Sequence, residues 1–103
     1  MSEKINNLQT EQVQRAVSIL TKELLESLNY SKSRSSIDSK NNVIFMFNVE
    51  HKAFNVVRMY ILKKSFEVHF EKHENNVIET KHAFKATEKE LKAKFNRGLG
   101  KLK

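Results

Sequence analysis

Residues 66–77 read Phe-Glu-Val-His-Phe-Glu-Lys-His-Glu-Asn-Asn-Val, and this stretch decides the fold. Apolar and polar side chains alternate from position 66 to position 71, which is the period of a strand with one buried face. Asn75 and Asn76 then supply turn chemistry, because asparagine tolerates left-handed backbone conformations. The stretch therefore predicts a β-hairpin in which a strand over 66–72 is followed by a returning strand over 77–84.

Two further strands are predicted before the hairpin. Residues 43–50 carry apolar side chains on both faces, which is typical of an interior strand. Residues 54–63 are rich in β-branched and aromatic side chains, which favours a strand over the alternative of a helix. The core face of this second strand is expected to hold Val57, Met59 and Ile61, with Arg58 and Tyr60 on the opposite face.

A helix is predicted over residues 10–29, where apolar side chains recur at three- and four-residue spacing. Ile19 and Leu25 fall beside this apolar stripe. They are explained either by a homodimer contact or by partial cover from loops. Residues 30–42 contain five serines and no hydrophobic period, which predicts a polar loop.

A second helix is predicted to start near Thr87. Thr87 and Glu90 have the spacing of a capping box, and Leu91 and Phe95 form the apolar stripe. Gly98 is expected to end this helix. The remaining residues, 98–103, would then form a basic tail.

These elements predict an α+β fold with an N-terminal helix, a three- to four-stranded antiparallel meander sheet and a C-terminal helix. A chain of 103 residues fits one small basic domain, with a flexible N-terminus at 1–9. The absence of cysteine excludes disulfides, thiol catalysis and cysteine-based metal sites. Apolar runs are only strand-length, and no signal or transit pattern opens the chain. The expected location is therefore cytoplasmic, with no membrane partner.

Charge is the strongest functional signal. The net charge is +7, yet residues 1–30 contain three basic and four acidic side chains. Residues 85–103 contain seven basic and two acidic side chains. Such a concentration of cations favours a polyanionic partner, because phosphate oxygens need cationic donors along a path.

The predicted nucleic-acid interface has three parts. The first is the basic C-terminal element, which comprises Lys85, Lys89, Lys92, Lys94, Arg97, Lys101 and Lys103. The second is the serine-rich loop, where Lys32 and Arg34 stand among hydroxyl groups. The third is a stacking platform formed by Arg58 and Tyr60 on one strand face.

Histidines supply a weak metal-site hypothesis. His69, Glu71 and His73 share one strand face, and a two-residue turn would place His69 opposite His82 and Lys72 opposite Glu79. Two cross-strand histidines and a carboxylate are possible zinc ligands. A hydrated sheet face is the simpler explanation, so no metal and no cofactor are expected.

No catalytic motif is present. The two glycines, Gly98 and Gly100, exclude a glycine-rich phosphate loop. The sequence therefore predicts a small non-enzymatic protein that binds nucleic acid or a nucleoprotein through its basic C-terminal helix. The alternative is a protein-interaction module, an inhibitor or adaptor that docks on an acidic partner or self-associates. A phage-like origin would suit the asparagine- and lysine-rich composition, and a small metal-dependent enzyme is the third hypothesis.

Overall fold

The computed structural model describes residue 15 and residues 18–102, except 38, 41 and 63. For residues 20, 21, 23 and 32–34 only the backbone is described. The predicted flexible N-terminus at 1–9 and the first part of the predicted N-terminal helix lie outside the described residues.

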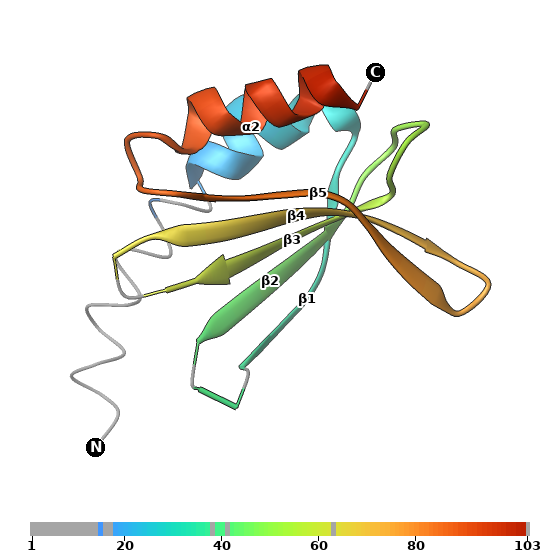
Figure 1. The fold of residues 1–103 in the computed structure, drawn as a ribbon, viewed down its shortest axis with the longest axis horizontal. Coiled ribbons are helices and arrows are strands. Elements are labelled where there is room, and N and C mark those ends of the chain that lie inside the picture. Colours follow the sequence, from blue (N-terminus) through green and yellow to red (C-terminus); the bar gives the residue numbers. More distant parts are fainter. Residues whose placement is uncertain (1–14, 16–17, 38, 41, 63, 103) are drawn as a thin grey trace.

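In the part of the chain that the structure describes, five antiparallel strands form one meander sheet (Figure 1). In chain order they are β1 (Ser31–Ile37), β2 (Val43–Asn48), β3 (Val56–Ile61), β4 (Phe66–Glu74) and β5 (Val77–Ala86). The C-terminal helix α2 (Leu91–Lys101) follows β5. The α+β class, the antiparallel meander and the C-terminal helix are thus confirmed, whereas the predicted count of three to four strands is wrong.

The extra strand is β1, which occupies most of the segment predicted as a serine-rich loop over 30–42. Its hydrogen-bonding partner is β2, with Ser35 opposite Phe45 and Ile37 opposite Val43. Because β2 is an interior strand, its outer edge needs a backbone partner, and a polar segment can supply one from the sheet edge. A hydrophobic pattern is not required there, since Ser35, Ser36 and Ile37 are all exposed. The loop prediction failed for this reason.

The segment with two possible assignments, residues 54–63, contains the strand β3 (Val56–Ile61) and not a helix. Within β3, Val57, Met59 and Ile61 are at most 1% exposed and face the core. Arg58 and Tyr60 are half-buried on the opposite face. The predicted facing of this strand is therefore confirmed.

The N-terminal helix differs from the prediction in its geometry. Described residues 15, 18 and 19 are α-helical as predicted, but the segment then continues as a π-helix, η1 (Leu20–Leu25), and a 3-10 turn, η2 (Glu26–Leu28). Asn29 then ends the segment with a left-handed φ of 52°. Leu24 and Leu25 are both buried, although they are adjacent in sequence and α-helical periodicity places only Leu24 on the stripe. The irregular winding brings both side chains to the sheet.

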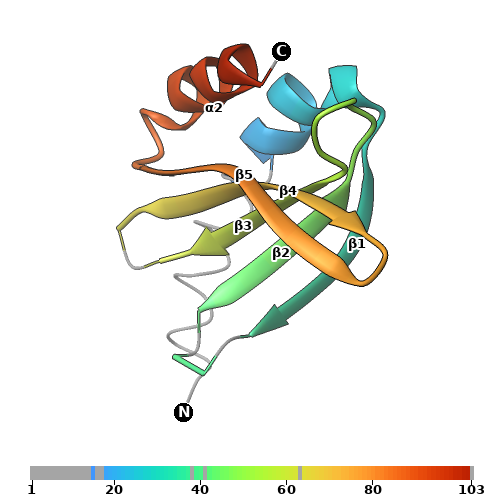
Figure 2. The same ribbon diagram turned by 45° about the vertical axis from the view of Figure 1, so that its right-hand side comes forward.

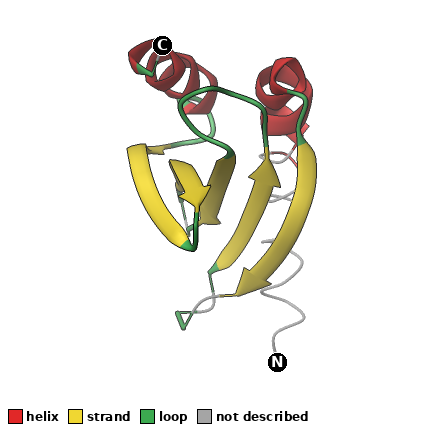
Figure 3. Ribbon diagram, turned by 90° about the vertical axis from the view of Figure 1, so that its right-hand side faces the viewer, coloured by secondary structure: helices red, strands yellow, loops and turns green. Residues whose placement is uncertain are grey.

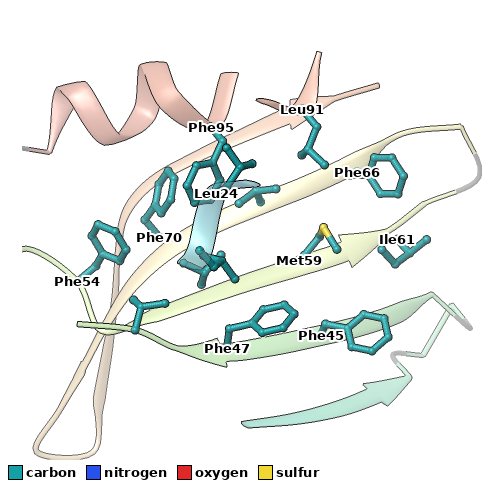
Figure 4. Close-up of a cluster of buried hydrophobic side chains, with 14 residues drawn as sticks. Leu24, Phe45, Phe47, Phe54, Met59, Ile61, Phe66, Phe70, Leu91 and Phe95 are labelled. Atoms are coloured by element: carbon teal, nitrogen blue, oxygen red, sulfur yellow. The ribbon is translucent and has the colours of Figure 1, made fainter. Parts of the chain in front are cut away.

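The core lies between one face of the sheet and the helices, which both cover that face (Figures 2 and 3). From the sheet, β4 contributes Phe66, Val68 and Phe70, as their alternation predicts, and all three are at most 1% exposed. From α2, Leu91 and Phe95 are fully buried against them (Figure 4). No helix of the described residues is long and apolar enough to cross a membrane.

The β4–β5 hairpin has the predicted turn and a shifted register. Asn75 and Asn76 have φ values of 54° and 64°, and Lys72 pairs with Glu79 as expected. Beyond that pair, the register shifts between Phe70 and Glu71, so that His82 pairs with Phe70. The predicted His69–His82 pair is therefore wrong, because Lys81 is an extra residue in β5 and a bulge of one residue reverses the facing of everything after it.

Helix α2 begins and ends later than predicted. A turn over 88–90 precedes it, and regular α-helix starts at Leu91. Gly98 does not end it, since the helix continues to Lys101 and most of the predicted basic tail over 98–103 is helical. The role of Gly98 is close packing. A Cβ atom there would lie 2.7 Å from Phe70 Cε2 and 2.8 Å from His82 Cδ2.

Replacement of this glycine tests the close contact between helix and sheet. Gly98→Ala should lower the free energy of unfolding by about 1–3 kcal/mol, because the Phe70 ring is held by other aromatic rings and cannot move aside freely. Gly100→Ala is the matched control, since nothing lies within 4 Å of its added Cβ. That variant should gain about 0.5–1 kcal/mol from helix propensity. Urea unfolding measures both, and equal effects of the two variants would contradict the contact.

Candidate nucleic-acid interface

Helix α2 presents most of the predicted cations on its outer surface. Lys89 in the preceding turn is exposed, as are Lys92, Arg97 and Lys101. Lys94, Arg97 and Lys101 follow one another at three- and four-residue spacing, so they form one row along the helix, here called the cation row. This row ends at the C-terminus of α2, where positive charge is also favoured by the helix dipole.

Lys94, the first member of the cation row, also fixes the start of the helix. Its Nζ donates to the carbonyl oxygen of Lys85 at 2.9 Å and lies 3.5 Å from Glu90 Oε1. The same carboxylate accepts the backbone N–H of Thr87 at 3.0 Å, which is one half of the predicted capping box. Lys94 is therefore committed to protein contacts, whereas Arg97 and Lys101 are exposed to solvent.

The cation row leads into a shallow depression that sequence reasoning missed. Four lysines from different segments line it, together with two glutamates and two apolar side chains. We call it the lysine depression. Its lining residues are Lys52, Lys72, Lys81, Lys101, Glu74, Glu79, Ala53 and Leu102. Four cations against two anions leave the depression net positive, which suits a phosphate group.

Two local features position these lysines, a side-chain amide and a β-bulge. The side chain of Asn55 accepts the N–H of His73 at 2.8 Å and donates to the carbonyl oxygen of His73 at 2.9 Å. This amide fastens the loop that carries Lys52 to strand β4. The bulge in β5 places Lys81 at the depression, where its Nζ lies 3.2 Å from Glu79 Oε1.

Of these four lysines, only Lys101 was predicted as part of the interface. The predicted pairing of Lys72 with Glu79 gave a partial signal for one more. Lys52 and Lys81 carry no local signal, because a loop contact and a bulge bring them to the depression.

The predicted stacking platform is a charged network on the sheet face opposite the helices. Glu71 lies at its centre, only 4% exposed, and accepts Arg58 Nε at 3.2 Å. His73 Nε2 lies 2.7 Å from the same carboxylate oxygen. The Tyr60 ring packs against His69, with 5.1 Å between ring centroids. Arg58 is thus engaged by Glu71 and Tyr60 by His69, and both side chains are half-buried, so their stacking role stays a prediction.

The three histidines of the metal hypothesis are not brought together. His69 and His73 lie on the Glu71 face, whereas His82 is turned to the helix face and stacks near Phe70 at 6.0 Å. Within the described residues, no group of three His, Cys, Asp or Glu side chains is arranged to hold a metal ion. Lys103 and the side chains of Lys32 and Arg34 lie outside the described part of the chain, although both loop cations fall within β1.

The start of α2 predicts a pH dependence. The backbone N–H of Thr87, followed by the charge of Lys94, lowers the pKa of the Glu90 carboxyl below its ordinary value of 4.5. A lowered pKa stabilises the folded state at pH values above the pKa of the unfolded state. This stabilisation is lost as the pH falls through the pKa of the folded state. Carboxyl NMR titration should show the lowered pKa. In Glu90→Gln, unfolding measured from about pH 6 to pH 2 should lose that part of its pH dependence. A Glu90 carboxyl that titrates at its ordinary value would contradict the capping contact.

The Glu71 network predicts a difference between two carboxylates on the same face. Glu71→Gln should lower the free energy of unfolding by about 1–3 kcal/mol, because it weakens the contacts of a buried, hydrogen-bonded group. Glu67→Gln is the control, since the Glu67 side chain is 37% exposed while its His69 contact is equally short, at 2.7 Å. Its effect should stay below about 1 kcal/mol. Chemical denaturation measures the free energy of unfolding of both variants. A loss in Glu67→Gln equal to or larger than that in Glu71→Gln would be inconsistent with a buried centre at Glu71.

Comparison with known proteins adds no functional information. A scan against protein-family models found no match, and searches of curated proteins and solved structures found none either. Assignment of a function therefore rests on the side chains described above.

Proposed function

We propose that the protein binds nucleic acid, free or within a nucleoprotein, and that Arg97 and Lys101 of the cation row and the lysine depression contact its phosphates. The observation that carries the proposal is the convergence of Lys52, Lys72, Lys81 and Lys101 in one depression. These lysines come from four segments of the chain. Arg97 extends the positive surface along α2, so that cations follow a path, as a phosphate backbone requires.

The chemistry of the cations indicates the type of binding. Lysine is a compact point charge without the planar fork that reads a base edge, and Arg97 is the only arginine of α2. Contacts of this kind fix the position of a nucleic acid and carry little sequence information. We therefore propose binding that depends strongly on salt and weakly on sequence.

The structure removes the observation that suggested a self-associating protein-interaction module. That suggestion rested on Ile19 and Leu25, which fall beside the apolar stripe of the first helix. Leu25 is fully buried in the core, and Ile19 is half-buried and packs against the core. These side chains are therefore occupied within the protein, and the nucleic-acid proposal remains the better supported.

Two matched double variants test the proposal. Lys52→Gln/Lys101→Gln removes two exposed charges from the lysine depression, and Lys22→Gln/Lys64→Gln removes two exposed charges elsewhere. Binding of a labelled duplex is measured by fluorescence anisotropy over a salt series. The first variant should lower the slope of log affinity against log salt by about 1–2, as expected for two lost phosphate contacts, and the second should change it far less.

A third variant examines α2. Lys89→Gln/Lys92→Gln/Arg97→Gln leaves Lys94 in place, because Lys94 holds the start of the helix. This variant should also bind more weakly. Failure of the parent protein to bind DNA or RNA at low salt would overturn the proposal. Equal losses in the two matched doubles would show that net charge alone, and not the depression, governs binding.

A further inference from the structure

The free end of the β4–β5 hairpin stands apart from the rest of the protein. Eight consecutive residues, 74–81, are all exposed, and of these Glu74, Glu79 and Lys81 border the lysine depression. Figure 1 shows this end reaching away from the helices and the other strands. The bulge at Lys81 lies where the hairpin leaves the body, and a bulge increases local twist and bends a strand. The hairpin is thus a short two-stranded arm.

The tip of this arm is apolar on both sides. Val77 is 63% exposed and Ile78 is 57% exposed, and they directly follow the Asn75–Asn76 turn. Successive strand residues point to opposite faces, so the two side chains project from both faces of the arm. Exposure of large aliphatic side chains to water is unfavourable, so their burial against a partner would stabilise a complex.

The base of the same arm borders the net-positive lysine depression. Lys72 and Lys81 belong to the two strands of the hairpin and line the lysine depression, together with Lys101 from the end of α2. An apolar tip ahead of cations complements a molecule whose surface is anionic and whose interior is apolar. Duplex nucleic acid has this arrangement, with phosphates outside and stacked bases inside.

We propose that the β4–β5 hairpin enters a groove of duplex nucleic acid and places Val77 and Ile78 as a wedge between base pairs. This proposal rests on the nucleic-acid binding proposed above. The lysine depression holds the flanking phosphates while the aliphatic tip separates the stacked bases, as minor-groove wedges do. Binding is then accompanied by local unstacking, which phosphate contacts alone do not cause.

The carboxylates of the arm oppose the binding of phosphates, and this effect can be measured. Glu79 is compensated by its ion pair with Lys81 and lies opposite Lys72 in the register. Glu74 immediately precedes the turn and is exposed, so a phosphate near the tip would be repelled by it. Glu74→Gln should therefore tighten duplex binding, by up to about tenfold.

The test uses a short duplex that carries the fluorescent base 2-aminopurine, whose emission rises when it unstacks. The full-length parent should bind the duplex and raise this emission. Val77→Thr/Ile78→Thr keeps β-branched residues in an exposed strand. It should weaken binding by about fivefold to tenfold and remove the rise in emission, while the salt slope remains. Ile37→Thr, at an equally exposed isoleucine in β1, is the matched control and should behave as the parent.

The outcomes separate the two proposals. If the parent binds the duplex without raising the emission, the wedge is wrong and the phosphate-binding function stands. An unchanged emission rise in Val77→Thr/Ile78→Thr would also overturn the wedge. Absence of duplex binding by the parent overturns the wedge, and the phosphate-binding function falls with it only if single-stranded DNA and RNA also fail to bind at low salt. Vesicles of phosphatidylcholine and phosphatidylserine form the last arm, and a tip-dependent binding to vesicles but not to the duplex would assign the tip to lipid and overturn the wedge.

Discussion

The burial of Phe70 is the contact on which the rest of the structure depends. Its ring is fully buried in β4 and lies 5.0 Å from the Phe95 ring of α2 and 4.9 Å from the Phe54 ring of the loop between β2 and β3. Phe84 of β5 is 6.1 Å away. One side chain thus joins the helix, the loop and the last strand, since aromatic rings at these separations attract one another beyond their area burial. Gly98 allows the helix to approach closely enough for this packing.

The same packing positions the cations. Because α2 is held over β4, its C-terminus lies beside the loop of Lys52, and Lys101 joins the lysine depression. Because the bulge turns His82 under Gly98, Lys81 stands as the extra residue at the base of the hairpin arm. A hydrophobic constraint in the core therefore determines where the exposed charges gather. The proposed phosphate contacts are a consequence of the fold as much as of composition.

The two sheet faces have different characters, and this separates structure from proposed function. The face opposite the helices carries the Glu71 network, whose side chains are committed to one another. Ion pairs of this kind impose geometry, because a buried carboxylate needs its hydrogen-bond donors. The cations available to a partner lie instead at the helix layer and at the base of the hairpin arm. The stacking role of Arg58 and Tyr60 stays a prediction, since both side chains are half-buried on this face.

The sequence by itself determined the presence of the strands β2, β3 and β4, the Asn75–Asn76 turn and the stripe of Leu91 and Phe95. Local periodicity and turn chemistry encode these features directly. Tertiary structure alone decided the strand β1, the length of α2 and the register beyond Lys81. Each depends on a partner distant in the sequence: the open edge of β2, the rings beneath Gly98 and the bulge opposite Phe70. The lysine depression belongs to this second group, because three-dimensional packing brings its four lysines together from segments that share no motif.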